Sequence, residues 1–242
     1  MTGVEFLDFT YPTTAQNLAL DEALLNACET GAQGPLLRFW TPDAYAVVLG
    51  YSRPASADVE LEACAQNRIA VERRSSGGGT VLQGPGVLNY AVILPLGPLG
   101  QLSSVTGAHR YVLERTARAV SRLTGSSVEL RGDSDLAVGE MKFSGNAQRR
   151  MLRSVLVHGT LLLGLDIALV GSYLKVPERQ PAYRASRSHG EFLVNLGLSP
   201  ARFKAELREV WGATHASTGP PQAEVDRLVR DRYSRKDWVF RR

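Results

Sequence analysis

Apolar positions recur at two spacings along the chain, one typical of helices and one of strands. The segment from Thr13 or Thr14 to Gly31 places leucines and Cys28 near helical spacing, with a capping residue at its start and a glycine at its end. This pattern predicts a helix, because threonine caps helix N-termini and glycine commonly terminates helices. The same spacing predicts further helices at 58–67, 107–123, 166–174, 200–211 and 222–233.

Short apolar runs bounded by Pro, Asp or Gly predict strands. Such runs lie at 35–40, 44–50, 69–73, 80–83, 87–94, 128–130, 141–148 and 154–163. Gly84-Pro85-Gly86 favours a tight turn between two of them. Strands dominate the middle of the chain and helices its flanks, so we expect an α+β fold with a mixed β-sheet flanked by helices. No internal repeat or long linker interrupts the pattern, which favours a single domain over residues 1–242.

Composition sets the class of protein. The chain has 242 residues, of which 44% are hydrophobic and 21% charged. A chain of this length and apolar content can bury a full core. Two cysteines are too few for a disulfide framework, and both fall in predicted helices, so we expect a reducing, cytoplasmic setting. The N-terminus has no secretory pattern, and no apolar run reaches about 18 residues, which argues against a membrane span.

The net charge of +4 favours anionic partners. Nucleic acid, a phosphorylated small molecule and an acidic protein domain all fit this charge, and a solvated basic face is an equally good interpretation. Among the basic residues, one cluster could steer an acidic domain: Arg149, Arg150 and Arg153.

A glycine-rich segment, 72–81, is the most informative stretch. Glycines lack a Cβ atom, so the backbone of Gly77, Gly78 and Gly79 can approach a ligand closely, and successive N–H groups can bind an anion. Arg73 and Arg74 add positive charge, which suits a phosphate or a carboxylate. A plain flexible turn is an equal alternative, because the segment lacks the Lys-Ser/Thr ending of a P-loop.

Two further segments carry candidate chemistry. Lys142 stands between apolar neighbours on a predicted strand, where an ammonium could stabilise negative charge on a carboxylate or an α-phosphate. The alternative is a lysine that extends from an edge strand into solvent. His158 opens an apolar strand and is more often a hydrogen-bonded structural residue than a base. No histidine or cysteine stands near it at metal-ligand spacing, so we expect no zinc site.

Together these three segments resemble the lipoate-protein ligase A family. Residues 73–81 are similar to its glycine-rich signature, 142–147 to its lysine motif, and 158–162 to its His-Gly-Thr-Leu-Leu stretch, in the same order and spacing. The resemblance covers about 18–196 and leaves a helical C-terminal segment at 197–242. It implies an α+β catalytic domain like those of biotin protein ligases and octanoyltransferases.

The resemblance also implies an activity. Lipoate or octanoate reacts with ATP and Mg²⁺ to give an acyl-adenylate, and a lysine of an acceptor domain then takes the acyl group. The implied partners are the lipoyl domains of 2-oxoacid dehydrogenases or the glycine cleavage H protein. The resemblance implies no binding to nucleic acid or to a membrane.

The resemblance assigns roles to residues of this chain. Lys142 is the implied catalytic residue, contacting the acyl carbonyl and the α-phosphate, whereas the Mg²⁺ ligands stay unknown. The implied acyl- and adenylate-binding residues are Arg73, Arg74, Ser76, Gly77, Gly78, Gly79, Asn89, Asp135, Gly145, Ala147, His158, Gly159 and Thr160.

The chain departs from the ligase pattern at several positions. Gln83 stands where the family usually has His, and Ser134 where it has Asn. Gly84-Pro85-Gly86 resembles the His-Gly-Pro-Gly of octanoyltransferases, which use a cysteine thiolate, yet neither Cys28 nor Cys64 falls in a matching position. Two alternatives therefore stay open: an ATP-independent octanoyl or lipoyl transferase, and a non-catalytic acyl- or adenylate-binding protein.

The C-terminal segment is short. The 46 residues after Leu196 predict two helices and no large accessory domain. A ligase of this length could act with a separate accessory polypeptide.

Overall fold

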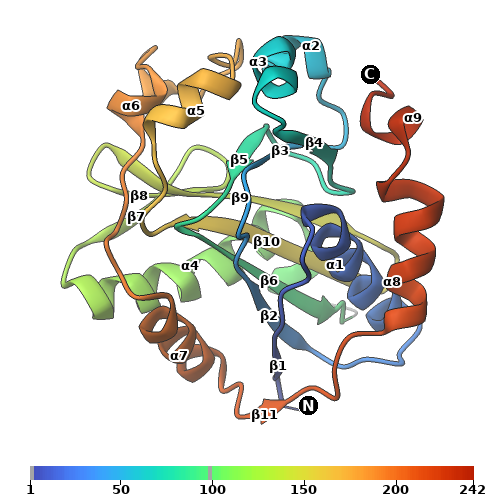
Figure 1. The fold of residues 1–242 in the computed structure, drawn as a ribbon. Coiled ribbons are helices and arrows are strands. Elements are labelled where there is room, and N and C mark those ends of the chain that lie inside the picture. Colours follow the sequence, from blue (N-terminus) through green and yellow to red (C-terminus); the bar gives the residue numbers. More distant parts are fainter. Residues whose placement is uncertain (1–2, 98–99) are drawn as a thin grey trace.

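A mixed eight-stranded sheet forms the centre of the computed structural model, which describes residues 3–97 and 100–242 (Figure 1). The strand order is β11-β1-β2-β6-β10-β9-β8-β7, with parallel pairing between β11, β1 and β2 and antiparallel pairing elsewhere. The strands are β1 (Glu5–Asp8), β2 (Leu36–Trp40), β6 (Val87–Pro95), β7 (Val128–Arg131), β8 (Asp135–Val138), β9 (Met141–Arg150), β10 (Ser154–Leu162) and β11 (His215–Ala216).

A second sheet of three strands lies above the first. Its order is β4-β3-β5, with β3 parallel to β4 and antiparallel to β5. The strands are β3 (Ala46–Leu49), β4 (Ala70–Arg73) and β5 (Val81–Gln83). Apolar side chains pack between this sheet and the helices beside it, among them Val47, Leu82 and Val170.

Helices cover both faces of the large sheet (Figure 1). On one face, Phe39 and Val157 pack against the helices α4 (Val105–Thr124) and α7 (Pro200–Trp211). On the other, Ile93 packs against α1 (Thr14–Glu29) and α8 (Gln222–Leu228). The remaining helices are α2 (Ala55–Asp58), α3 (Leu61–Gln66), α5 (Ala168–Tyr173), α6 (His189–Phe192), α9 (Lys236–Val239), the 3₁₀ turns η1 (Gln101–Ser103) and η2 (Ala182–Arg184), and the π-helix η3 (Val229–Tyr233).

This arrangement confirms the predicted α+β fold with a mixed sheet and flanking helices. The first helix begins as predicted, because Thr13 and Gln16 form a reciprocal capping box at its N-terminus. None of the helices in 3–97 and 100–242 combines the length and apolar character needed to cross a membrane.

The helix predicted at 58–67 is wrong in its first turn. Val59 has extended backbone angles and forms a β-bridge to Leu174, so the chain makes two short helices, α2 and α3, on either side of it. β-branched valine favours extended backbone, and here a pairing partner stabilises it. The strands β1, β8 and β11 were not predicted.

Candidate functional site

A pocket of about 140 Å³ lies between the two sheets. Its floor is a row of residues aligned across five neighbouring strands of the large sheet: Trp40, Asn89, Thr160, Gly145 and Asp135. Because neighbouring strands lie about 4.8 Å apart, the row extends roughly 19 Å. A long, narrow substrate could therefore lie along this row.

The two ends of the pocket differ in polarity. Lys142 and Asp135 form an ion pair at one end of the row, with 2.7 Å between Nζ and Oδ1. Trp40 stands at the other end, and Val48 and Val81 from the three-stranded sheet add apolar lining. The pocket thus suits a molecule with a charged head and an apolar chain.

Lys142 reaches the pocket because of a register shift in β9. Side chains alternate between the faces of a strand, so Lys142 and Gly145 should face opposite ways. The pairing of β8 with β9 slips between Leu136 and Ala137, leaving Phe143 as the extra residue. A β-bulge of this kind re-aims side chains. A Cβ atom on Gly145 would accordingly lie only 3.1 Å from the Lys142 Nζ.

The glycine-rich loop is held in place by Arg74. Its guanidinium donates to the carbonyl oxygens of Gly77 and Gly79 at 2.6 and 2.7 Å, and to the Ser76 hydroxyl at 3.1 Å. Burial lowers the pKa of Arg74 to about 10. Arg74, Gly78 and Gly79 line the pocket, so this arginine both shapes the loop and presents charge beside it.

Arg73 points away from the pocket, which corrects the prediction that it lines the site. Its guanidinium donates to the backbone oxygens of Gly50, Arg53 and Val239 at 2.7–2.8 Å. Arg73 is the last residue of β4 and Arg74 follows it, and of the two only Arg74 lines the pocket. Ser76 and Gly77 also fall outside the lining and support the loop instead.

A partly buried hydrogen-bond relay, which sequence reasoning missed, joins α1 to the glycine-rich loop. The Ser76 hydroxyl lies 2.6 Å from Nε2 of His158, and Nδ1 of His158 lies 3.2 Å from Asp21. Asp21 also pairs with Arg38, whose side chain is fully buried. Both ring nitrogens of His158 have hydrogen-bond partners, so neither is free. The histidine therefore helps to fix the pocket wall.

Asn89 forms a reciprocal pair with Gln83 in the pocket lining. Each amide donates to the oxygen of the other, at 2.8 and 2.9 Å, and both side chains are buried. Buried amides are costly when unpaired. The glutamine at position 83 therefore introduces no unsatisfied polar group into the pocket.

The remaining predicted residues lie together on the strands β9 and β10. The pocket lining contains Gly145, Ala147, His158, Gly159 and Thr160. Beside them, Asn146 receives a hydrogen bond from Tyr90 at 2.6 Å and donates to the Ser134 carbonyl at 2.8 Å. A Cβ atom on Gly159 would lie 1.8 Å from Oδ1 of Asn146, so this position requires glycine.

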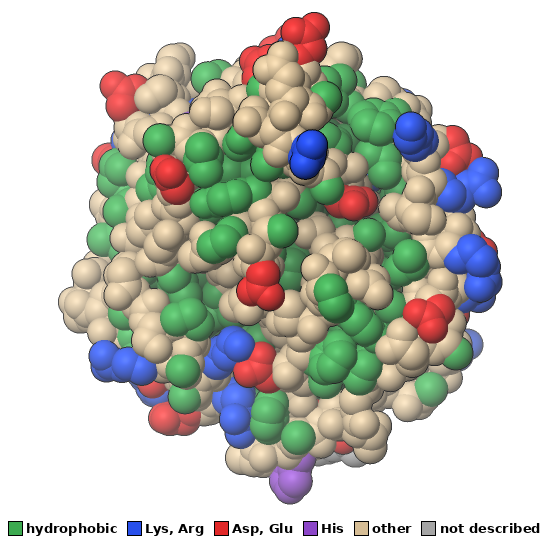
Figure 2. Space-filling view, in the orientation of Figure 1, with side chains coloured by type: hydrophobic (Ala, Val, Ile, Leu, Met, Phe, Trp, Pro, Cys, Tyr) green, Lys and Arg blue, Asp and Glu red, His purple; other side chains and the backbone are tan. Residues whose placement is uncertain are grey.

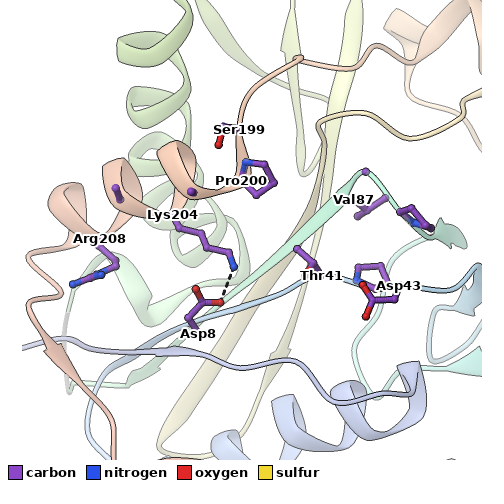
Figure 3. Close-up of a pocket in the computed structure, with 13 residues that line it drawn as sticks. Asp8, Thr41, Asp43, Val87, Ser199, Pro200, Lys204 and Arg208 are labelled. Atoms are coloured by element: carbon purple, nitrogen blue, oxygen red, sulfur yellow. Dashed lines mark hydrogen bonds and ion pairs between the residues drawn. The ribbon is translucent and has the colours of Figure 1, made fainter.

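A larger hollow, of about 720 Å³, lies beside α7 (Figure 3). Lys204 and Asp8 form an ion pair across it at 2.7 Å. The hollow contains none of the predicted site residues, although Pro85 and Gly86 of the β5–β6 turn contribute to its wall. We therefore take the smaller pocket as the candidate site.

The arginine cluster at 149–153 is partly engaged within the protein. Arg149 pairs with Glu22 at 3.0 Å, and Arg150 donates to the Ser103 carbonyl. In Figure 2, basic side chains are instead prominent at the edge beside α8 and α9. The hypothesis that this cluster steers an acidic domain stays a prediction.

Gly78 and Gly77 provide a matched pair of substitutions. Gly78 has φ of +86°, and a Cβ atom there would lie 2.9 Å from Nη2 of Arg74, whereas Gly77 faces open space. Because a left-handed alanine is strained, we expect Gly78→Ala to lower the free energy of unfolding by about 1–3 kcal/mol. Urea denaturation measures the change. Gly77→Ala should differ from wild type by less than about 0.5 kcal/mol, and equal losses in both variants would contradict this description of the loop.

Glu72, next to Arg73, gives a pH-dependent prediction. Burial raises the pKa of Glu72 from 4.5 to about 7. The folded state therefore favours the protonated carboxyl. The stability that this preference adds is complete below pH 4.5 and is lost as the pH rises through 7. We expect Glu72→Gln to increase the free energy of unfolding by about 1–2 kcal/mol at pH 8.5 and to change it little at pH 4. The exposed Glu62→Gln is the control, and an identical effect of Glu72→Gln at both pH values would refute the prediction.

Comparisons with known proteins agree on one family. Residues 13–200 match the model of the lipoyl protein ligase A/B catalytic domain. Octanoyltransferase LipM of Geobacillus kaustophilus is 27% identical to this chain, with 98% of each sequence covered.

Two solved structures share the fold. A lipoate-protein ligase A bound with ATP superposes with a TM-score of 0.83 at 25% identity, over 99% of both chains. A chain from the bipartite lipoate protein ligase and E2 lipoyl domain system of Thermoplasma acidophilum also has a TM-score of 0.83, at 22% identity, over 99% of this chain and 97% of that one. The chain therefore belongs to the lipoyl protein ligase A/B catalytic-domain family, as its family-model match over most of its length shows.

Proposed function

We propose that this chain activates lipoate or octanoate with Mg-ATP and transfers the acyl group to a lysine of an acceptor domain. The observation that carries the proposal is the pocket, which has Lys142 and Asp135 at one end of a row of about 19 Å and Trp40 at the other. An extended eight-carbon acyl chain can lie along the row with its carboxylate towards Lys142.

The first step joins the substrate carboxylate to the α-phosphorus of ATP, and pyrophosphate leaves. Negative charge increases on the phosphoryl oxygens, and the Lys142 ammonium stabilises it from a partly desolvated position. The backbone of Gly78 and Gly79 lies at the pocket, where the phosphate can approach it. Magnesium enters as part of the nucleotide substrate, and Asp135 is the carboxylate among the lining residues.

The second step transfers the acyl group. The neutral amine of an acceptor lysine attacks the acyl carbonyl, AMP leaves, and the amine loses a proton. In this scheme Asn89, Gly145, Ala147, His158, Gly159 and Thr160 line the bound acyl-adenylate, and Arg74 holds the loop against it.

The two cysteines favour this route over a cysteine-dependent transferase. Cys28 lies in α1 and Cys64 in α3, both buried and outside the pocket lining. Burial raises the pKa of the Cys28 thiol to about 11, so it is protonated at neutral pH. A thiol in this state is a poor nucleophile.

Exchange of labelled pyrophosphate into ATP tests the activation step. With Mg-ATP and either lipoate or octanoate, we expect exchange that depends on the added acid. The absence of acid-dependent exchange, in a protein that is folded and binds lipoate, would refute the proposed ligase activity.

A second candidate is an ATP-independent acyl transferase, which the likeness to an octanoyltransferase favours. Ser76, His158 and Asp21 stand in the order that activates a serine hydroxyl in hydrolases. We rank this candidate second because Ser76 is only 2% exposed and lies outside the pocket lining. Incubation with an octanoyl thioester distinguishes the two: an octanoyl adduct on Ser76, absent from Ser76→Ala, would support the transferase.

The acceptor is proposed to be a lipoyl domain, because the related Thermoplasma system pairs a bipartite ligase with its E2 lipoyl domain. The same likeness supports a separate accessory polypeptide for this chain. Acylation that rises when such a polypeptide is added would support that part of the proposal.

A further inference from the structure

Tyr183 joins Lys142 through a shared carboxylate. The Tyr183 hydroxyl donates to Oδ2 of Asp135 at 2.8 Å, and Oδ1 of the same carboxylate pairs with the Lys142 Nζ at 2.7 Å. Asp135 and Lys142 line the pocket, whereas Tyr183, on η2, lies outside the lining. The three side chains therefore form a continuous chain at the charged end of the pocket.

The segment that carries Tyr183 is held in a specific backbone conformation. Ala185 and Ser186, which follow η2, have φ of 50° and 59°, a left-handed conformation that residues other than glycine rarely adopt. Arg187 stabilises this conformation by donating to the carbonyl oxygens of Tyr183 and Glu140, at 2.8 and 3.0 Å. Such strain persists where surrounding contacts enforce it, and it is common near functional sites.

Tyr183 is well suited to donate a hydrogen bond. Its ring packs beside Phe192, with 5.1 Å between ring centroids. Burial, together with the Asp135 carboxylate, raises the pKa of Tyr183 above its ordinary value, so the hydroxyl keeps its proton. Hydrogen bonds between a hydroxyl and a carboxylate are among the stronger ones in proteins.

The binding of an acyl-adenylate requires Lys142 to change partners. Its ammonium pairs with Asp135 here, but the proposed reaction needs it beside the substrate carboxylate and the α-phosphate. Asp135 then loses one of its two partners in a partly buried position, and its charge both repels the phosphate and attracts the lysine back. A second donor to Asp135 reduces both effects.

We propose that Tyr183 is a positioning residue for adenylate formation, holding Asp135 in place while Lys142 leaves it for the substrate. This inference rests on the proposed ligase function. The role depends on the hydrogen bond from the Tyr183 hydroxyl to the Asp135 carboxylate. Loss of the hydroxyl should therefore affect adenylate formation only while residue 135 is a carboxylate.

A double-mutant cycle in the full-length chain tests the inference. We expect Tyr183→Phe to lower kcat for adenylate formation about tenfold, the effect of one lost hydrogen bond to a charged group, and to change KM for the acid less than about twofold. In the Asp135→Asn background the same substitution should change kcat less than about twofold, because the charged acceptor is already gone. Tyr173→Phe is the control, since the Tyr173 hydroxyl has no hydrogen-bond partner among the described residues and lies outside the pocket lining.

Binding of a non-reactive acyl-sulfamoyl adenosine provides a second measurement, independent of turnover. Calorimetry should show that Tyr183→Phe binds the analogue more weakly than wild type does. Asp135→Asn and the double variant Asp135→Asn/Tyr183→Phe should bind it equally. Equal losses in both backgrounds, or no loss in either, would overturn the role of Tyr183 and leave the ligase proposal standing. A wild-type chain that neither binds the analogue nor forms adenylate would overturn the ligase proposal itself.

Discussion

Replacement of Lys142 with alanine is expected to lower the rate of acyl-adenylate formation by about 10²–10³-fold, which is the cost of removing one preorganised group that stabilises transition-state charge. The lysine lies at the charged end of the pocket and is 24% exposed, so its ammonium acts where water is partly excluded. Acid-dependent pyrophosphate exchange measures the loss. Because Lys142 and Asp135 are both partly exposed, the fold itself should be retained.

Lys204→Ala is a matched control. Lys204 also pairs with an aspartate at 2.7 Å and is 20% exposed, but it lies in the larger hollow beside α7. Its replacement should leave adenylate formation within about twofold of wild type, as expected for a surface substitution. If Lys142→Ala retains wild-type exchange, the assignment of Lys142 fails, and another group must stabilise the transition-state charge.

Replacement of Asp21 with alanine is expected to lower the free energy of unfolding by about 3–5 kcal/mol, because it leaves the buried Arg38 charge without its partner. Arg38 is 0% exposed, so water cannot replace the lost carboxylate. The variant also removes the partner of His158 Nδ1 and so loosens the relay to Ser76. Urea denaturation measures the change, and the control Asp8→Ala, at an exposed ion pair, should cost about 1 kcal/mol or less.

The same pair predicts how stability depends on pH. Burial acts to raise the pKa of Asp21, but the Arg38 guanidinium and His158 outweigh it and hold the pKa below its usual range. The stabilisation is therefore present above the unfolded-state pKa, near 3.9, and is lost as the pH falls through the lower folded-state value. The difference in stability between wild type and Asp21→Ala should shrink in acid. A constant difference from pH 7 to pH 2 would contradict this account of the pair.

Much of the fold could be predicted from the sequence, since long apolar strands and capped helices have strong local signals. The strands β6 and β10 were placed within a residue or so of their observed bounds. The strands β1, β8 and β11 have only two to four residues, too few for a clear alternation of polar and apolar positions. Their pairing depends on neighbours that are distant in sequence, which a local pattern does not contain.

The pocket could be predicted only in part. The glycine-rich loop and Lys142 stood out as motifs, and both lie at the pocket. Asp21 and Tyr183 were missed, because they meet His158 and Asp135 only across 137 and 48 residues of chain. Arg73 was misplaced because two adjacent arginines look equivalent in the sequence, whereas at the end of β4 Arg73 binds backbone oxygens and only Arg74 lines the pocket.

The most direct test of the central claim is the intact mass of an unlipoylated lipoyl domain after incubation with this protein. One mixture contains Mg-ATP with lipoate or octanoate, a second lacks ATP, and a third contains an octanoyl-carrier protein without ATP. The proposed ligase predicts that the domain gains one acyl group only in the first mixture. Acylation from the carrier in the absence of ATP, with none from the free acid and ATP, would contradict the ligase and identify the chain as a transferase.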